Sequence, residues 1–212
     1  MHNKRAQFFP YGDDNERKSF PYITVGLIAI NIIIFIWSLF NFEATINSFG
    51  FIPASVSFAT IFTSMFLHGG VAHLFGNMWY LWIFGDNVED KFGKVYFILF
   101  YILCGIAATL THWLTNLGSA IPAIGASGAI SGVLGSYVVL FPKAKVYVGG
   151  RLGMSQLPAW LVIGLWFLLQ LLLGTAALFG QSSGIAFWAH VGGFVFGFLL
   201  TFVLKLLKIV KI

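Results

Sequence analysis

Apolar residues fall into six long stretches, separated by segments that contain polar residues, glycine or proline. The stretches cover residues 22–40, 70–85, 95–115, 125–141, 157–179 and 185–204. One crossing of a bilayer takes about 20 apolar residues, so the pattern predicts six membrane-spanning helices. A shorter apolar run, 55–67, lies in the long connection 41–69. We expect this connection at the membrane surface or dipping into it.

Composition supports the same class of protein. Of the 212 residues, 58% are hydrophobic and only 9% are charged, and the mean hydropathy is +0.88. Because a soluble domain carries about 25% charged residues, a soluble, disordered, collagen-like or coiled-coil protein is excluded. We predict an all-α polytopic membrane protein, with a short polar cytoplasmic tail at 1–21 and a six-helix membrane domain at 22–212.

The basic residues indicate how the helices are oriented. All twelve lie before the first stretch, between the second and third, between the fourth and fifth, or after the sixth. The connections 41–69, 116–124 and 180–184 contain none. The positive-inside rule therefore places both termini in the cytoplasm, so that the second, fourth and sixth helices run inward. The net charge of +5 is then explained by anchors that touch anionic lipid, and nucleic-acid binding is not predicted.

Polar residues stand near the outer ends of those three inward-running helices. His73 and Asn77 are four apart and share one helix face, Ser127 lies near the start of the fourth stretch, and His190 lies near the start of the sixth. Polar residues at membrane depth are costly and usually functional. One such histidine alone is equally well explained by packing, but the four residues at one depth predict a shared site.

Small residues support a close approach of the fourth and sixth helices. Gly128 and Gly132 form one pair at a spacing of four, and Ala189, Gly193 and Gly197 form a stripe on the other helix. Such stripes let helix backbones approach closely. Because Ser127 precedes Gly128 and His190 follows Ala189, this contact would bring the two side chains within reach.

A serine hydroxyl is a weak nucleophile until a neighbouring base takes its proton, and His190 can serve as that base. No acidic residue lies in the outer half of any predicted helix, so we predict a Ser127–His190 dyad without an acidic third member. The backbone N–H of Ser127 and the side chains of His73 and Asn77 are the candidate oxyanion donors. No metal or organic cofactor is expected, and Cys104, in an apolar run, is read as a packing residue.

Three segments carry a family resemblance. HGGVAHLFGNMWYLWIFGDNVED, GASGAISGVLG and AHVGGFVFG resemble the signatures of the rhomboid family of intramembrane serine proteases. The opening PYGDDNERKSFPYITVGLIAINIIIFIW is similar to bacterial and archaeal members. The resemblance implies the basic six-helix rhomboid core. It also implies Ser127 as nucleophile, His190 as general base, His73 and Asn77 as oxyanion-stabilising residues, and a structural role for Glu89.

Two departures from the family pattern affect what can be carried over. Family members often have a Trp-Arg pair in the first outer connection, but 41–69 contains neither residue. Some members place a tyrosine against the histidine ring, four residues after the nucleophile, and this chain has Ser131 there. The fold of the connection and the orientation of His190 therefore stay open.

The resemblance further implies that the substrate is a transmembrane segment of another protein. The glycine-rich surroundings of Ser127 predict a small residue before the cleaved bond. The helix 157–179 and the connection 180–184 are either a mobile entry gate or a plain lipid-facing span. Because no organelle-targeting segment is visible, we expect a prokaryotic plasma membrane. The oligomeric state is left open.

Three other functions remain as alternatives. A catalytically silent rhomboid-like protein would bind membrane clients, but such proteins usually lack the serine or histidine that this chain has. A transporter or proton channel would use His73 and His190 as relays, but no carboxylate pathway leads through the inner half. A lipid hydrolase could use the same dyad.

Overall fold

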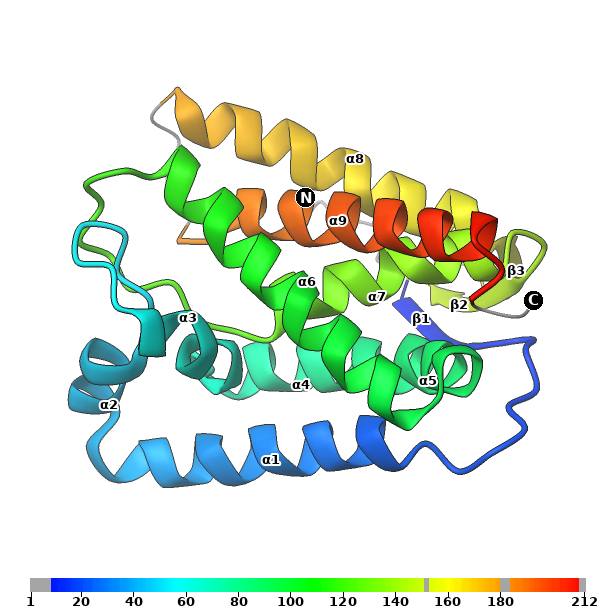
Figure 1. Ribbon diagram of the computed structural model, residues 1–212, viewed down its shortest axis with the longest axis horizontal. Coiled ribbons are helices and arrows are strands. Elements are labelled where there is room, and N and C mark those ends of the chain that lie inside the picture. Colours follow the sequence, from blue (N-terminus) through cyan, green and yellow to red (C-terminus); the bar gives the residue numbers. More distant parts are fainter. Residues whose placement is uncertain (1–8, 151–152, 180–183, 210–212) are drawn as a thin grey trace.

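The computed structural model describes residues 9–150, 153–179 and 184–209, and these are mostly helical (Figure 1). The elements in chain order are β1 (Phe9–Asp13), α1 (Tyr22–Ser38), η1 (Leu39–Asn41), α2 (Phe42–Phe49), α3 (Phe58–Thr63), η2 (Ser64–Phe66), α4 (Val71–Tyr80), the π-helical η3 (Leu81–Gly85), α5 (Asp86–Phe92), α6 (Lys94–Thr115), α7 (Ser127–Leu140), β2 (Lys145–Gly150), β3 (Gly153–Pro158), α8 (Ala159–Leu178) and α9 (Phe187–Leu206).

Each of the six apolar stretches contains a helix, but the helices differ in length. In the described part of the chain, four are long and apolar enough to cross a membrane: Tyr22–Phe49, Lys94–Thr115, Ala159–Leu178 and Phe187–Leu206. A fifth is counted if Phe58–Phe66 and Val71–Phe92, which meet at 88°, form one bent span. The chain is therefore a multi-pass membrane protein. The connection 41–69 is largely helical, because it contains α2, α3 and η2.

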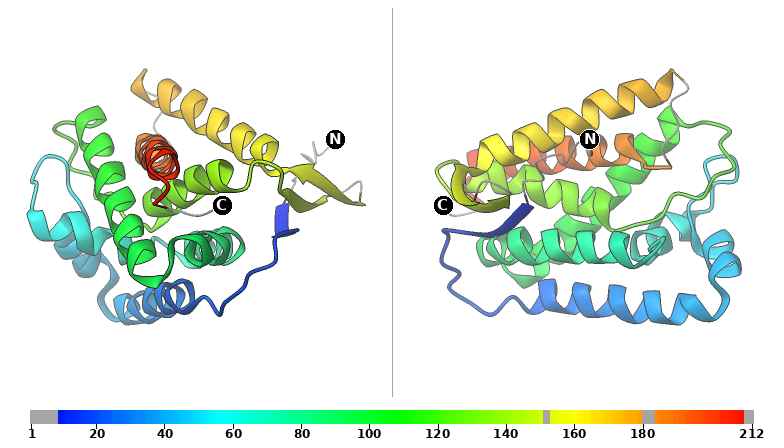
Figure 2. Two further views of the ribbon diagram at one scale, coloured as in Figure 1. Left: turned by 45° about the vertical axis from the view of Figure 1, so that its right-hand side comes forward. Right: turned by 180° about the vertical axis from the view of Figure 1, so that it is seen from behind.

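Helix α7, with only 14 residues, lies in the middle of the bundle (Figures 1 and 2). It packs most extensively against α9 and then against α6, and nearly all of its residues are buried. A helix surrounded by other helices does not have to match the thickness of the lipid. This position explains how a short helix belongs to a membrane domain.

The predicted approach of the fourth and sixth helices is confirmed. A Cβ atom added to Gly197 would lie 2.6 Å from the Cα of Gly132, and one added to Gly132 would lie 3.1 Å from the carbonyl oxygen of Gly193. On Gly135 it would lie 2.9 Å from the backbone nitrogen of Phe198. Side chains at these positions would push α7 and α9 apart, so the glycines set the spacing of the two helices.

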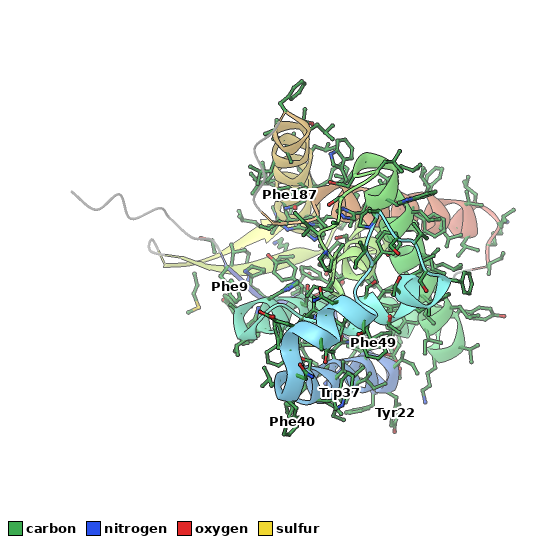
Figure 3. All side chains as sticks on the ribbon, turned by 90° about the vertical axis from the view of Figure 1, so that its left-hand side faces the viewer. Phe9, Tyr22, Trp37, Phe40, Phe49 and Phe187 are labelled. Atoms are coloured by element: carbon green, nitrogen blue, oxygen red, sulfur yellow. The ribbon has the colours of Figure 1, made fainter. Side chains whose placement is uncertain are left out.

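Exposed aromatic side chains mark both ends of α1 (Figure 3). Tyr22 begins the helix and is 58% exposed, whereas Trp37 and Phe40 lie at its other end and are 51% and 88% exposed. Aromatic side chains of this kind are enriched where a membrane meets water. Their positions agree with α1 as a membrane span.

Glu89 on α5 holds the start of α1. Its two carboxylate oxygens accept hydrogen bonds from the backbone N–H groups of Ile23 and Thr24, at 3.0 and 2.8 Å. The first N–H groups of a helix have no partner within it, and a buried carboxylate satisfies two of them here. This geometry agrees with the structural role that the resemblance implies for Glu89.

The sequence pattern did not predict a β-sheet. Strands β1, β2 and β3 form an antiparallel sheet in that order, so part of the predicted polar tail is attached to the membrane domain. Asp13 strengthens the attachment because it accepts hydrogen bonds from Tyr137 and Asn87, at 2.7 and 2.9 Å. Burial raises the pKa of Asp13, and the bond from Tyr137 partly offsets that shift.

The sheet, α5, the start of α1 and the end of α9 gather at one end of the bundle (Figure 1, right). The opposite end carries α2, α3 and the connection between α6 and α7. The basic residues Lys4, Arg5, Arg151 and Lys211 lie outside the described residues.

Candidate active site

Ser127 is the first residue of α7, whose opposite end leads into the sheet. The preceding Gly125 has φ +128°, a conformation that L side chains rarely adopt. Its backbone N–H donates to the carbonyl oxygen of Ser64 at 2.9 Å. Because Ser127 begins its helix, its own N–H has no partner within that helix and is available as a donor.

His190 lies in the first turns of α9, opposite Ser127. Its Nε2 is 2.8 Å from the Ser127 Oγ, which is hydrogen-bond distance. The structure therefore brings together the two residues that the sequence predicted as a pair.

Two residues beside His190 were missed by the sequence reasoning. The Oε1 of Gln170 on α8 lies 2.8 Å from the His190 Nδ1. The ring of Trp166, one turn earlier on α8, lies 5.9 Å from the imidazole, centroid to centroid. A glutamine inside an otherwise apolar span is a signal that could have identified Gln170.

Ser131 has a different role from the tyrosine found at that position in some family members. Its Oγ donates to the carbonyl oxygen of Ser127 at 2.6 Å, within α7. The aromatic ring beside the His190 imidazole comes from Trp166 on another helix.

Helix α4 contributes His73 and Asn77. The Nδ1 of His73 accepts a hydrogen bond from the backbone N–H of Gly69 at 3.3 Å, so a neutral ring carries its hydrogen on Nε2. A Cβ added to Gly125 would lie 2.8 Å from the His73 Nε2 and 3.6 Å from the Ser127 Oγ, so both atoms border the same small space. The Asn77 amide nitrogen is buried and has no hydrogen-bond partner among the described residues.

These side chains surround a cavity of about 690 Å³. It is bordered by α4, α7, α8, α9 and the segments before α7 and α9, through residues that include His73, Asn77, Ser127, Trp166, Ile185 and His190. Ser127 therefore faces a space large enough for part of a polypeptide. Of the described residues, no three His, Cys, Asp or Glu side chains are grouped so that they could hold a metal ion.

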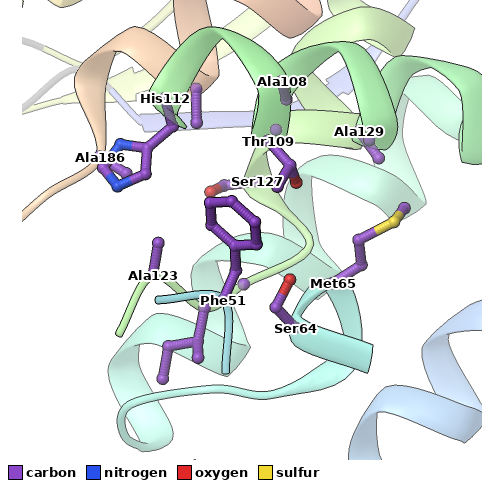
Figure 4. A pocket seen from close by; sticks show the side chains of 15 residues that line it. Phe51, Ser64, Met65, Ala108, Thr109, His112, Ala123, Ser127, Ala129 and Ala186 are labelled. Atoms are coloured by element: carbon purple, nitrogen blue, oxygen red, sulfur yellow. The ribbon is translucent and has the colours of Figure 1, made fainter. Parts of the chain in front are cut away.

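A second, much smaller pocket also borders Ser127 (Figure 4). Its volume is about 30 Å³, and its polar lining includes Ser64, Thr109 and His112. A space of this size holds about one water molecule.

The arrangement has the parts that acyl transfer needs. A serine hydroxyl touches a histidine nitrogen, and N–H donors from Ser127 and His73 border the same cavity, with the Asn77 amide beside them. The fold and site thus define a multi-pass helical membrane protein with a serine–histidine pair inside its helix bundle.

Comparison with known proteins identifies the family. Residues 55–206 match the Rhomboid domain, and the chain belongs to the rhomboid family. The chain is 30% identical over 180 residues to presenilin-associated rhomboid-like protein, mitochondrial, of Bos taurus, covering 81% of this chain and 46% of that protein. It is 30% identical over 146 residues to RHOMBOID-like protein 5 of Arabidopsis thaliana, covering 69% and 44%.

Rhomboid protein 1, mitochondrial, of Saccharomyces cerevisiae is 30% identical over 186 residues, which cover 84% of this chain and 51% of that protein. The chain therefore spans about half the length of these curated relatives.

Proposed function

We propose that the chain is an intramembrane serine endopeptidase that cleaves transmembrane segments of membrane proteins. The observation that carries the proposal is the 2.8 Å contact between the Ser127 Oγ and the His190 Nε2, at the wall of a cavity within the bundle. Membership of the rhomboid family supports the same activity.

In the first half of the reaction, the Ser127 Oγ attacks the carbonyl carbon of the cleaved bond while the His190 Nε2 takes its proton. Negative charge develops on the carbonyl oxygen. Donors from the Ser127 backbone, His73 and Asn77 stabilise that charge. His190 then gives the proton to the departing amine, the C–N bond breaks, and an acyl-serine ester remains.

In the second half, water attacks the ester carbon while His190 takes a proton from it, and Ser127 is restored as the leaving group. Water must therefore reach Ser127 inside the bundle. Both the small pocket and the larger cavity border this residue.

The substrate must present an extended peptide bond, because a helical one is shielded by its own hydrogen bonds. Small or helix-breaking residues lower the cost of local unwinding. Close packing around Ser127, where a Cβ on Gly128 would touch Ala108, favours a small residue before the cleaved bond. Residues 180–183 of the candidate gate lie outside the described residues.

The proposed topology has six crossings with both termini in the cytoplasm. It is supported by the six apolar stretches and by the absence of Lys and Arg from the connections 41–69, 116–124 and 180–184. The membrane we propose remains the prokaryotic plasma membrane, and membrane lipid is the surrounding partner.

The test is cleavage of a model single-span protein by the purified chain in liposomes. Wild type is compared with Ser127→Ala, His190→Ala and the control Ser48→Ala, whose serine is exposed on α2. We expect cleavage by wild type and by the control only, with product masses that place the cut in or next to the substrate helix.

Equal cleavage by Ser127→Ala would exclude the proposed nucleophile. A folded wild-type protein that cleaves nothing would favour a client-binding rhomboid-like protein instead. Hydrolysis of lipid esters with no cut in the protein substrate would favour a lipid hydrolase.

A further inference from the structure

Gln170 is the one polar residue among the four buried residues of the largely apolar helix α8. The side chain is 6% exposed, whereas its neighbours Leu169 and Leu172 are 49% and 61% exposed. Burying an amide in such surroundings is costly unless its polar atoms find partners. The partner of its oxygen is the His190 Nδ1, at 2.8 Å.

The direction of the amide follows from its two contacts. The Gln170 Nε2 lies 3.4 Å from the backbone carbonyl oxygen of Trp166. Because that oxygen can only accept a hydrogen bond, the Nε2 is the donor. The Oε1 therefore faces His190, and since an amide oxygen has no hydrogen to donate, the His190 Nδ1 must donate. In a neutral ring the lone pair is then on Nε2, which is the atom that faces the Ser127 Oγ.

The Gln170 amide keeps the hydrogen of the neutral His190 ring on Nδ1 without adding a charge to the site. In the described structure, the ionisable side chains beside the pair, apart from His190 itself, are His73 and Tyr80 on α4, which line the larger cavity, and His112 on α6, which lines the smaller pocket. None of these is a carboxylate, so none of them places a negative charge opposite the Nδ1 to favour one ring tautomer. The neutral acceptor on α8 supplies that preference.

The same contact joins α8 to α9. A second hydrogen bond between these helices runs from the Trp188 Nε1 to the carbonyl oxygen of Gly174, at 3.0 Å. Gln170 and Gly174 lie four residues apart on the buried face of α8. The docked position of α8 therefore determines whether the His190 Nδ1 has its acceptor.

We propose that Gln170 is a positioning residue, which holds His190 in the tautomer and orientation that leave Nε2 free to take the Ser127 proton. This inference rests on the proposed endopeptidase function. It assigns to a neutral amide the place that an acid occupies in a serine–histidine–acid triad.

The test compares wild type with Gln170→Met, Gln170→Glu and the control Thr175→Val, at an exposed position on the same helix. The turnover number, KM and pH profile are measured with the model single-span substrate, and thermal unfolding is followed in parallel. For Gln170→Met we expect the turnover number to fall by on the order of 100-fold, which is the lower end of what a positioned general base contributes. KM should change little. For Gln170→Glu we expect more activity than for Gln170→Met. The acid limb of its pH profile should lie at higher pH than in wild type, because a carboxylate stabilises the imidazolium and the neutral base then forms only at higher pH.

A direct readout of the tautomer does not depend on activity. In protein labelled with ¹⁵N-histidine, the His190 signals, assigned by comparison with His190→Ala, should report hydrogen on Nδ1 in wild type and a tautomer mixture in Gln170→Met. A purely structural Gln170 would change unfolding and leave both the tautomer and the pH profile as in wild type.

The outcomes separate the two proposals. An active wild type, with Gln170→Met unchanged in turnover, pH profile and tautomer, would overturn the positioning role and leave the endopeptidase intact. An inactive wild type would overturn the endopeptidase, while the ¹⁵N signals would still decide whether Gln170 sets the tautomer. If Gln170→Met does not fold, the shifted pH profile of Gln170→Glu decides, and an unshifted profile counts against the role.

Discussion

Asn77 lines the cavity, and its amide nitrogen is buried without a hydrogen-bond partner among the described residues. An unsatisfied buried donor costs about 1–3 kcal/mol, and an oxyanion would supply the acceptor that the Asn77 amide lacks. The neighbouring His73 ring, which accepts from Gly69 through Nδ1, directs its other nitrogen toward the same space as Ser127. Donors that are in place before charge develops are effective because they need no reorganisation during the reaction.

We therefore expect Asn77→Ala to lower the turnover number by about 100- to 1,000-fold, as loss of one oxyanion donor does in other serine hydrolases. KM should change little, because the donor acts on charge that exists only in the transition state. Asn47→Ala, at an exposed position on α2, is the control. Steady-state kinetics on the single-span substrate measures the effect. A turnover number equal to that of wild type would remove Asn77 from the oxyanion site.

The contact between α7 and α9 determines whether the two catalytic side chains meet. Ser127 and His190 come from different helices, so their 2.8 Å separation depends on how closely the backbones approach. Glycines at 132, 135, 193 and 197 permit this approach, since an added Cβ at each would collide with the facing helix or with a neighbour. Helix packing and the geometry of the site are thus set by the same residues.

Replacing Gly197 by alanine should separate the helices. The new methyl group would lie 2.6 Å from the Gly132 Cα, and such overpacking costs about 1–3 kcal/mol. Thermal unfolding in detergent should therefore occur at a lower temperature, and activity should fall. In the control Gly164→Ala on α8, the methyl group would have no other atom within 4 Å. Equal unfolding temperatures for the two variants would contradict the account of this contact.

The sequence predicted the helices and the pairing of Ser127 with His190, but it did not predict the residues around that pair. Ser127 and His190 were predictable because polar residues and small-residue stripes stand out against apolar spans. Gln170 also stands out in its span, but its contact with His190 was not predictable, since one glutamine in a helix gives no indication of which neighbour it faces. The sheet was missed because β1 begins in a polar tail, and its pairing with β2 joins residues more than a hundred positions apart.

The two ends of the whole molecule differ in character. One end holds the sheet, the Glu89 contacts to α1 and the end of α9, and the other end holds α2, α3 and the connection that leads to Ser127 at the start of α7 (Figure 1). The basic residues in the described part of the chain lie in segments at the first of these ends. The proposed orientation therefore places the dyad toward the outer surface and the sheet in the cytoplasm.

Single cysteines can test this orientation in a bacterial host. Cys104 is buried and is first replaced by alanine, and a cysteine is then introduced at either Glu16 or Ala120, both of which are exposed. We expect a membrane-impermeant thiol reagent, added to intact cells, to modify the cysteine at 120 and to leave the one at 16 unmodified. Breaking the cells should make both reactive. The reverse pattern in intact cells would contradict the proposed topology.

The central claim is that His190 activates Ser127 as a nucleophile inside the bundle. A fluorophosphonate reacts with activated serines, so the measurement needs no knowledge of the natural substrate. Intact-mass analysis and peptide mapping are applied to wild type, Ser127→Ala, His190→Ala and the control Ser48→Ala, each shown to be folded. The account predicts one adduct, on Ser127, in wild type and in the control, and none in the other two variants. An adduct on another serine, or undiminished labelling of Ser127 in His190→Ala, would contradict it.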